Sequence, residues 1–259
     1  GRLVRLFGGP NDPPHLRNLS IQTMYQDDGG TLWLGTLGAG LLRFDPATGQ
    51  AKQYRPDPRD PGSISGARIL SVTGDGTTSV YVGVDNRGLD ILDIHTDLFT
   101  HYSPDQDDPT SLASASIWSL WLDDQEILWI GTYNSGVDSA SLLGPRFGLI
   151  GAGHGALSDG HVMAILEDHL GNLWIGTDGG GLNHLDRKTG RFEYLRHDPS
   201  NPTGLSADAV LALCEDAQHN IWIGTWAGGL QRLDPASGQF TTYRHDPVPS
   251  DPLALNSYW

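Results

Sequence analysis

The chain has 259 residues, with 31 acidic and 16 basic side chains and a formal net charge of −15 at pH 7. This excess of negative charge opposes binding to nucleic acid or to an anionic membrane surface, so neither is an expected partner. No apolar run approaches the length of about 18 residues that a membrane span needs, so we expect no direct membrane contact by this chain. Residues 1–7 lack the charged and apolar zones of a secretion signal, and we expect any targeting or anchoring segment to lie outside the sequence.

The same frame recurs five times along the chain: a short apolar strand, an Asp, and six residues later an aromatic residue that opens Trp-Ile-Gly-Thr or a close variant. Successive aromatic residues are 48, 48, 45 and 48 positions apart, and they are Trp33, Tyr81, Trp129, Trp174 and Trp222. This period is typical of one four-stranded propeller blade. The sequence therefore predicts an all-β propeller, with the aromatic residues packed between neighbouring sheets.

The repeat from residue 161 to residue 198 illustrates the expected blade. Four strands, here named a to d, are predicted at 162–166, 173–177, 182–186 and 192–195, because apolar runs alternate with turn residues. Asp168 opens the turn between strands a and b, where its carboxylate can accept hydrogen bonds from backbone amides ahead of it. A column of glycines precedes strand c in every repeat and predicts a turn conformation that side chains disfavour: Gly40, Gly88, Gly136, Gly181 and Gly229.

The repeats predict five complete blades with a partial blade at each end. The complete blades are expected at about 19–55, 67–103, 115–150, 160–196 and 208–245. Residues 1–7 align with strand d of a preceding blade, and residues 253–259 align with strand a of a following blade. Terminal repeats normally deviate from the pattern to cap exposed edges, but these two end segments remain in register with it. We therefore expect this chain to be a segment of a larger propeller.

The only cysteine, Cys214, lies in a strand column whose other members are Tyr25, Thr73, Trp121 and Leu166. No internal disulfide can form, and a free cysteine usually packs as a small hydrophobic residue. We therefore expect a buried and unreactive thiol.

The last repeat carries the clearest family resemblance. Its pattern is Leu205-Ser206, Val210, Glu215-Asp216, Ile221-Trp222-Ile223-Gly224-Thr225, Gly228-Gly229-Leu230, Asp234, Ser237-Gly238-Gln239-Phe240 and Tyr243. This pattern resembles the two-component regulator propeller repeat, and the resemblance extends over essentially the whole chain. It implies a roughly seven-bladed propeller, commonly one of two in tandem, in the periplasmic sensor region of a hybrid histidine kinase or diguanylate cyclase.

The resemblance also implies a function. Members of this family often recognise oligosaccharides or other extracellular small molecules, so the chain is expected to sense a ligand without catalysing a reaction and without a cofactor. A homodimer would be formed through the parent receptor. Two repeats depart from the pattern: the second has Tyr81-Val82-Gly83-Val84 and places Asp97 where the hairpin glycine belongs. The third has a glycine-rich segment at 151–160, so the repeat does not predict the blade geometry between residues 139 and 160.

Candidate ligand-binding residues follow the Gly-Thr pair, at a position where the residue type varies among the repeats. This column holds Leu37, Asp85, Tyr133, Asp178 and Trp226. Tyr133 and Trp226 can stack on a sugar or another apolar face, whereas directional hydrogen bonds are expected from Asp85, Asp178, Asn86, Asn134 and Arg87. The alternative is that these are ordinary exposed turn residues that vary freely.

A second candidate group lies where strand a begins. Arg68, Ser116, His161 and Ala209 share one column, and Trp118 lies next to it. Arg68 and His161 could grip an anionic or hydroxylated ligand, or they could instead hydrogen-bond the linker backbone. His197 and His245 share a linker column, which favours a role in ordering the loop.

No catalytic or metal-ligand motif is present in the sequence. It lacks a His-Glu-x-x-His pattern, a Gly-x-Ser-x-Gly pattern and a second cysteine, so no catalytic residue and no metal site is predicted. The Asp columns lack the alternating oxygen donors of a calcium loop and are better explained as turn caps. Two alternatives to a sensor stay open: a scaffold that binds another protein, and a propeller lyase or hydrolase with His161 as its base.

Overall fold

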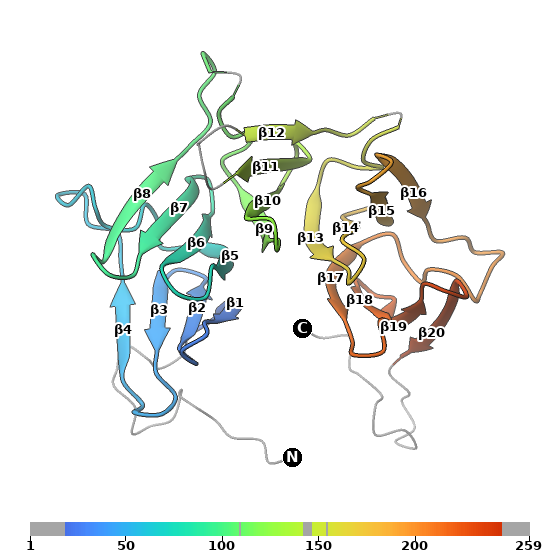
Figure 1. The fold of residues 1–259 in the computed structure, drawn as a ribbon, viewed down its shortest axis with the longest axis horizontal. Helices are drawn as coiled ribbons and strands as arrows, with labels where there is room; N and C mark the ends of the chain where they lie inside the picture. The colour runs from blue at the N-terminus through green and yellow to red at the C-terminus, as the bar shows by residue number, and fades with distance from the viewer. Residues whose placement is uncertain (1–18, 109, 142–146, 154, 245–259) are drawn as a thin grey trace. The chain divides into compact units, whose positions relative to one another are not determined.

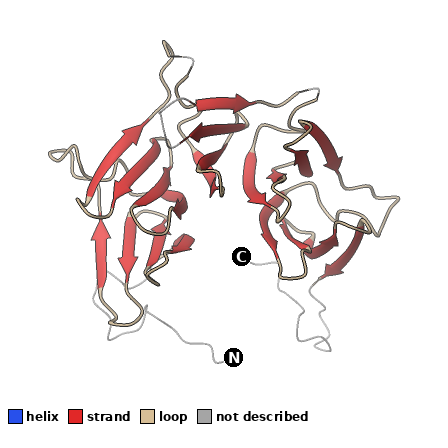
Figure 2. Ribbon diagram, viewed as in Figure 1, coloured by secondary structure: helices blue, strands red, loops and turns tan. Residues whose placement is uncertain are grey.

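The computed structural model describes residues 19–108, 110–141, 147–153 and 155–244. Within these ranges the secondary structure consists of strands and loops without a helix (Figure 2). The chain divides into two compact units, residues 1–122 and residues 123–259, which are described separately. The predicted strands at 1–7 and 253–259 lie outside the described residues, as does His245.

Unit 1 contains the strands β1 to β9 (Figure 1). Blade 1 consists of β1 (Ile21–Gln26), β2 (Leu32–Thr36), β3 (Leu41–Phe44) and β4 (Ala51–Tyr54). Blade 2 consists of β5 (Ile69–Gly74), β6 (Ser79–Val84), β7 (Gly88–Asp93) and β8 (Leu98–Tyr102), and β9 (Ile117–Leu122) ends the unit.

Unit 2 contains the strands β10 to β20. It begins with β10 (Ile127–Thr132), β11 (Val137–Ser141) and β12 (Phe147–Ile150). Blade 4 consists of β13 (Val162–Glu167), β14 (Leu173–Thr177), β15 (Leu182–Asp186) and β16 (Arg191–Leu195). Blade 5 consists of β17 (Val210–Glu215), β18 (Ile221–Thr225), β19 (Gly229–Asp234) and β20 (Gln239–Tyr243).

Blades 1, 2, 4 and 5 are four-stranded antiparallel meanders in which consecutive strands are neighbours, and in blade 3 the strands β10, β11 and β12 follow the same order. The third blade is regular where it is described, since β11 and β12 pair from Val137 opposite Ile150 to Ala140 opposite Phe147. Strands a of neighbouring blades contact one another, β1 with β5 and β5 with β9 in unit 1, and β13 with β17 in unit 2. This meander, repeated with converging first strands, is the β-propeller fold that the sequence predicts.

Close packing between neighbouring blades explains the glycine of the Trp-Ile-Gly-Thr motif. A Cβ atom at Gly35 would lie 2.7 Å from Cγ2 of Ile69, and one at Gly176 would lie 2.6 Å from Cγ1 of Val210. Strand b of one blade thus approaches strand a of the next so closely that only glycine fits. The packing between neighbouring blades buries Trp33, Tyr81, Trp129 and Trp174, whose packing role is confirmed, whereas Trp222 of blade 5 is only half-buried.

The thiol of Cys214 is exposed, so the prediction of a buried cysteine is wrong. Cys214 lies opposite Trp222 and Ala212 lies opposite Gly224, so these residues share the face of blade 5 that corresponds to the contact face of earlier blades. A Cβ atom at Gly224 would contact only Ala212, whereas one at Gly176 would meet Val210 of the next blade. Ala212 and Cys214 are both exposed, so this face of β17 is open to solvent.

Asp97 shows how blade 2 tolerates the loss of its hairpin glycine. It adopts a left-handed backbone with φ of 60°. Its carboxylate accepts a hydrogen bond from the Tyr54 hydroxyl at 2.7 Å and forms an ion pair with Lys52 at 2.7 Å. Burial and this hydrogen bond raise the pKa of Tyr54 above its ordinary value. Asp97 therefore replaces the glycine in the turn and also ties blade 2 to the outer strand of blade 1.

Candidate functional site

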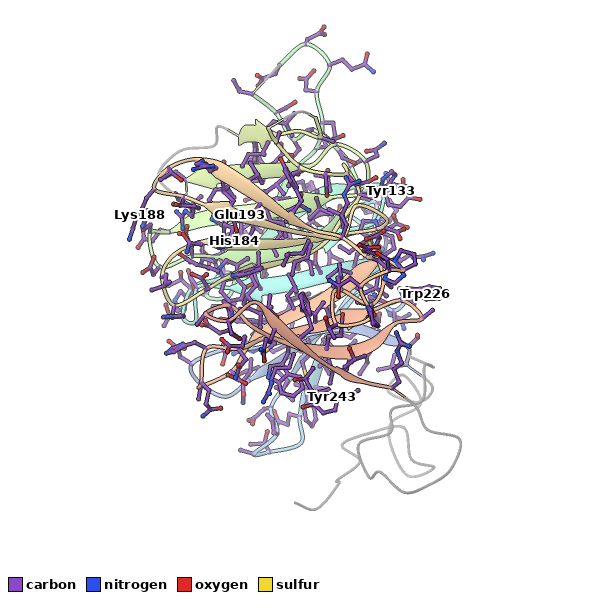
Figure 3. The ribbon with its side chains drawn as sticks, turned by 90° about the vertical axis from the view of Figure 1, so that its right-hand side faces the viewer. Tyr133, His184, Lys188, Glu193, Trp226 and Tyr243 are labelled. Atoms are coloured by element: carbon purple, nitrogen blue, oxygen red, sulfur yellow. The ribbon has the colours of Figure 1, made fainter. Side chains whose placement is uncertain are left out.

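The antiparallel hairpins place two kinds of turn at opposite ends of each blade. The ab turns, which join strands a and b, and the cd turns lie at one end, and the bc turns that follow the Gly-Thr pairs lie at the other. Figure 3 shows this separation within unit 2: Tyr133 and Trp226 belong to bc turns and lie at one end, and Lys188 belongs to a cd turn and lies at the other.

In the ab turns, an Asp side chain organises the turn and also holds the following tryptophan. Asp168 accepts hydrogen bonds from the backbone amides of Leu170 at 3.0 Å and Asn172 at 2.9 Å, and from Trp174 Nε1 at 2.9 Å. The same indole-to-carboxylate bond recurs at 3.0, 2.9 and 2.8 Å in Trp33–Asp27, Trp129–Asp123 and Trp222–Asp216. The prediction that these aspartates cap turns is confirmed, and the indole bond explains the constant spacing of six residues.

Blade 2 has a tyrosine where the other blades have this tryptophan. Tyr81 has no indole N–H to offer Asp75. Asp75 instead accepts hydrogen bonds from the Thr78 hydroxyl and from the backbone amides of Thr77, Thr78 and Ser79. The turn is therefore preserved although the motif is not.

Arg187 has two carboxylate partners in unit 2. Its guanidinium lies 2.9 Å from Asp123 and 2.8 Å from Glu167, and it stacks over the Trp129 ring at 5.2 Å. The Asp123 side chain is completely buried. A buried carboxylate that already has an arginine and an indole as partners is part of the architecture, not a ligand site.

The backbone of the bc turns is held by two bonds in blades 1, 2 and 4, and by at least one of the two in blades 3 and 5. The amide of the residue after Gly-Thr donates to the carbonyl that precedes strand a in the same blade, for example Asp178 to His161 at 2.9 Å and Trp226 to Ala209 at 2.9 Å. The glycine that ends the turn donates to the next blade, as Gly181 does to Asp208 at 2.9 Å. The turn backbone is thereby fixed while its side chains remain variable, which suits a recognition surface.

The candidate residues of unit 1 gather around Asp85. Its carboxylate forms an ion pair with Arg68 Nε at 3.4 Å and accepts a hydrogen bond from the Ser116 hydroxyl at 3.1 Å. Asn86 has a left-handed backbone with φ of 57°, and its amide donates to Ser116 Oγ at 3.2 Å. The partner of Arg68 is therefore a carboxylate, whereas the sequence suggested either a bound ligand or the linker backbone. Arg87 is exposed in the same turn, and Trp118 is half-buried on β9.

The candidate residues of unit 2 include one aromatic pair. The Tyr133 ring meets the His161 ring edge to face, with centroids 5.1 Å apart. His161 Nδ1 lies 2.8 Å from Asp159 Oδ1, so this histidine is oriented by a linker carboxylate. Asn134 and Asp178 are exposed. Trp226 is 52% exposed and Tyr133 is 47% exposed, which is unusual for rings of this size.

The structure also reveals a role for buried polar residues on strand c that sequence reasoning missed. Asp90, Asn183 and Gln231 are buried and accept the backbone N–H of Ser65, Ser158 and Ser206 at 2.7, 2.8 and 2.8 Å. They anchor the linker that enters strand a. The available signal was a polar residue at the same position of an otherwise apolar strand. In the last linker, His197 Nδ1 also contacts the Leu205 carbonyl at 2.8 Å, which confirms its loop-ordering role.

Among the residues that the structure describes, no helix is long and apolar enough to cross a bilayer. The fold and its turns define a β-propeller of four-stranded blades. The family "Two component regulator propeller" matches three segments of the chain, residues 15–38, 156–179 and 204–227. The chain therefore contains two-component regulator propeller repeats, as its sequence pattern indicated.

Solved structures show the same fold at low sequence identity. One is the extracellular domain of BT3049 from B. thetaiotaomicron, assigned to the hybrid two component systems, with a TM-score of 0.76, 24% identity and coverage of 89% of this chain and 31% of that one. PorZ of the type-IX secretion system of Porphyromonas gingivalis has a TM-score of 0.64 and 17% identity, with 89% and 34% coverage. Virginiamycin B lyase from Staphylococcus aureus has a TM-score of 0.65 and 13% identity, with 89% and 71% coverage.

The chain thus spans about a third of the length of the first two structures. No curated protein shows significant sequence similarity to it.

Proposed function

We propose that this chain is a non-catalytic ligand-sensing propeller of a bacterial membrane-bound receptor that acts in two-component or cyclic-dinucleotide signalling. The repeats of the two component regulator propeller family support this assignment, and the extracellular domain of BT3049 shares the fold. The rest of the receptor, including a membrane anchor and an output domain, belongs to the proposal. The sensor would lie in the periplasm.

The observation that carries the proposal is the exposure of Trp226 and Tyr133 on turns whose backbone is fixed. Both rings lie at the same end of unit 2 (Figure 3). Partly exposed aromatic rings of this size are frequent anchors for a ligand or partner. Flat aromatic faces stack on the apolar face of a sugar. Hydrogen-bonding groups are supplied by His161, which contacts Tyr133, by Asn134, which follows this tyrosine, and by Asp178 in the bc turn of blade 4. We therefore propose an oligosaccharide or another hydroxylated small molecule as the ligand.

A titration of the full receptor with fractionated oligosaccharide pools tests this proposal. The intrinsic tryptophan fluorescence should change on binding, because the environment of the exposed Trp226 indole changes when a ligand stacks on it. Trp226→Ala and Tyr133→Ala should each weaken binding at least about tenfold, as expected for aromatic anchors. Tyr194→Ala is the matched control, because Tyr194 is also exposed but lies on strand d, where it donates to the Ala156 carbonyl. Equal affinity in all four proteins would reject the site.

One observation supports a second candidate, a lyase or hydrolase. His161 and Asp159 form the histidine-carboxylate pair that a general base requires, with Nδ1 and Oδ1 2.8 Å apart. The pair is open to solvent, with the His161 side chain 42% exposed. This candidate predicts turnover of a bound ligand that His161→Ala abolishes, whereas the sensor predicts that the ligand is recovered unchanged.

A further inference from the structure

Three side chains converge between the ab turns of blades 4 and 5, away from the bc turns. His169 belongs to the ab turn of blade 4, Glu215 ends β17, and His219 belongs to the ab turn of blade 5. His169 Nδ1 lies 2.5 Å from Glu215 Oε1, and His219 Nδ1 lies 3.1 Å from the same oxygen. One ligand atom from each residue lies within 4.8 Å of the other two.

The carboxylate in this cluster is held in place before any ligand arrives. Glu215 Oε2 accepts the backbone N–H of His169 at 2.9 Å, and the Glu215 side chain is only 15% exposed. The two imidazole rings are stacked, with centroids 3.6 Å apart and an interplanar angle of 26°. The side chains of His169 and His219 are 38% and 54% exposed, so the cluster is sheltered on the Glu215 side and open on the other.

The turns themselves do not require these residues. The position of His169 is occupied in the other blades by Asp28, Gly76, Asp124 and Ala217. His219 has a left-handed backbone with φ of 65°, at the position of Gly30 and Gly171 in blades 1 and 4 and of Glu126, with φ of 60°, in blade 3. A non-glycine residue is disfavoured there, so turn formation alone does not explain the choice of histidine.

We propose that His169, Glu215 and His219 bind one divalent transition-metal ion and thereby cross-link the ab turns of blades 4 and 5. Two imidazole nitrogens and one carboxylate oxygen form a donor set that suits Zn²⁺, Co²⁺ or Ni²⁺ better than Ca²⁺ or Mg²⁺, which prefer oxygen ligands. The two Nδ1 atoms would bind the ion as unprotonated donors in place of their contacts with Glu215 Oε1. The open side leaves a coordination position for water or for a donor from another molecule.

The sequence predicted no metal site because its ligands come from two blades and follow no contiguous motif. The only signal was a histidine in each of two consecutive ab turns. The site is independent of the proposed ligand surface, since ab and bc turns lie at opposite ends of the blades. Failure of one proposal therefore leaves the other intact.

The test is calorimetric titration of ZnCl₂ into the full chain, free of any affinity tag and treated with EDTA. We expect one saturable site and a rise in Tm with Zn²⁺, because an ion that binds only the folded state stabilises it. His169→Ala, Glu215→Gln and His219→Asn should each weaken Zn²⁺ binding at least about tenfold, as ligand-shell changes do. Asn removes the imidazole of His219 but tolerates a left-handed backbone.

Two controls keep the result interpretable. His95→Ala removes an exposed histidine from the cd turn of blade 2 and should leave Zn²⁺ binding unchanged. Circular dichroism and the metal-free Tm establish that each variant is folded. The parent protein loaded with Co²⁺ should show visible ligand-field bands. The His169→Ala/His219→Ala double variant treated in the same way should not show them. The absence of a saturable site, or its persistence with unchanged affinity in the folded double variant, would overturn the proposal.

Discussion

The two ends of strand b in each blade differ in which residues and hydrogen bonds are the same in every repeat. At the ab end, the same side-chain bond between an Asp and an indole recurs in four blades. At the bc end, backbone hydrogen bonds recur, and in four blades the hydroxyl of the Gly-Thr threonine donates to the carbonyl of the glycine that ends the turn. The residue that follows this threonine varies from Leu37 to Asp85 to Trp226. Residues that repeat are therefore expected to maintain the fold, and residues that vary on a fixed backbone are the candidates for recognition.

The largest effect is expected from Trp174→Ala. Trp174 is buried, stacks on His184 at 4.2 Å and donates to Asp168. Loss of its volume and of this bond should lower the free energy of unfolding by about 3–5 kcal/mol. Urea unfolding followed by circular dichroism measures the change. A loss below about 1 kcal/mol would contradict the assignment of this column to the core.

The next effect is expected from a matched pair of glycine substitutions. Gly181 ends the bc turn of blade 4 with φ of 80°, and an added Cβ would lie 2.3 Å from the Leu195 carbonyl oxygen. Gly190 in the cd turn has φ of 71° but nothing within 4 Å of the added atom. Gly190→Ala should cost about 1–2 kcal/mol for the left-handed conformation alone, and Gly181→Ala should cost clearly more. Equal losses in urea unfolding would show that the bc turn is less constrained than its geometry implies.

A smaller, pH-dependent effect is expected at the ab end of blade 5. Loss of solvation by itself raises the pKa of Asp216, but hydrogen bonds from Asn220 and Trp222 outweigh it and lower the pKa from 3.8 to about 2. The depressed pKa means that the stabilisation is present above the unfolded-state value near 3.8 and is lost as pH falls through about 2. Asp216→Asn should therefore lose less stability than the parent chain over this interval. Urea midpoints across the same pH range check this, and parallel curves would contradict it.

The smallest effect on stability is expected at the bc end. Tyr133→Ala and Trp226→Ala remove exposed rings and should change the free energy of unfolding by no more than about 0.5 kcal/mol. A decrease in the free energy of unfolding above about 2 kcal/mol would show that these rings stabilise the fold, and would remove the reason to assign them to recognition. The same urea experiment provides the measurement.

The fold could be predicted because its determinants are local. In four blades the Asp of the ab turn bonds an indole six residues later in the same blade, and the glycine that ends each bc turn is needed for its own left-handed backbone, so their spacing is visible in the sequence. Interactions between blades are harder to predict from the sequence. The exposure of Cys214 depends on what packs over blade 5, and the pairing of His169 with Glu215 joins turns of two blades.

For the candidate ligand-binding residues, the sequence predicted positions but not partners. The varying column after Gly-Thr is found in the bc turns, yet nothing in the chain order indicated that Arg68 would pair with Asp85 or that His161 would pair with Asp159. These contacts depend on how the start of strand a meets a neighbouring turn or linker. The Arg68–Asp85 pair joins the start of strand a to a bc turn, whereas His161 and Asp159 are two residues apart in a linker that the repeat does not constrain.

The most direct test compares two tryptophans that are four residues apart, Trp222 in strand b and Trp226 in the bc turn. Urea unfolding and oligosaccharide binding would be measured on this chain with Trp222→Phe or Trp226→Ala. Trp222→Phe removes the bond to Asp216 and should lose about 1–3 kcal/mol of stability while binding at low denaturant is retained. Trp226→Ala should show the reverse, with stability retained and binding lost. Loss of both properties in Trp226→Ala, or of neither, would contradict the separation of architecture from recognition.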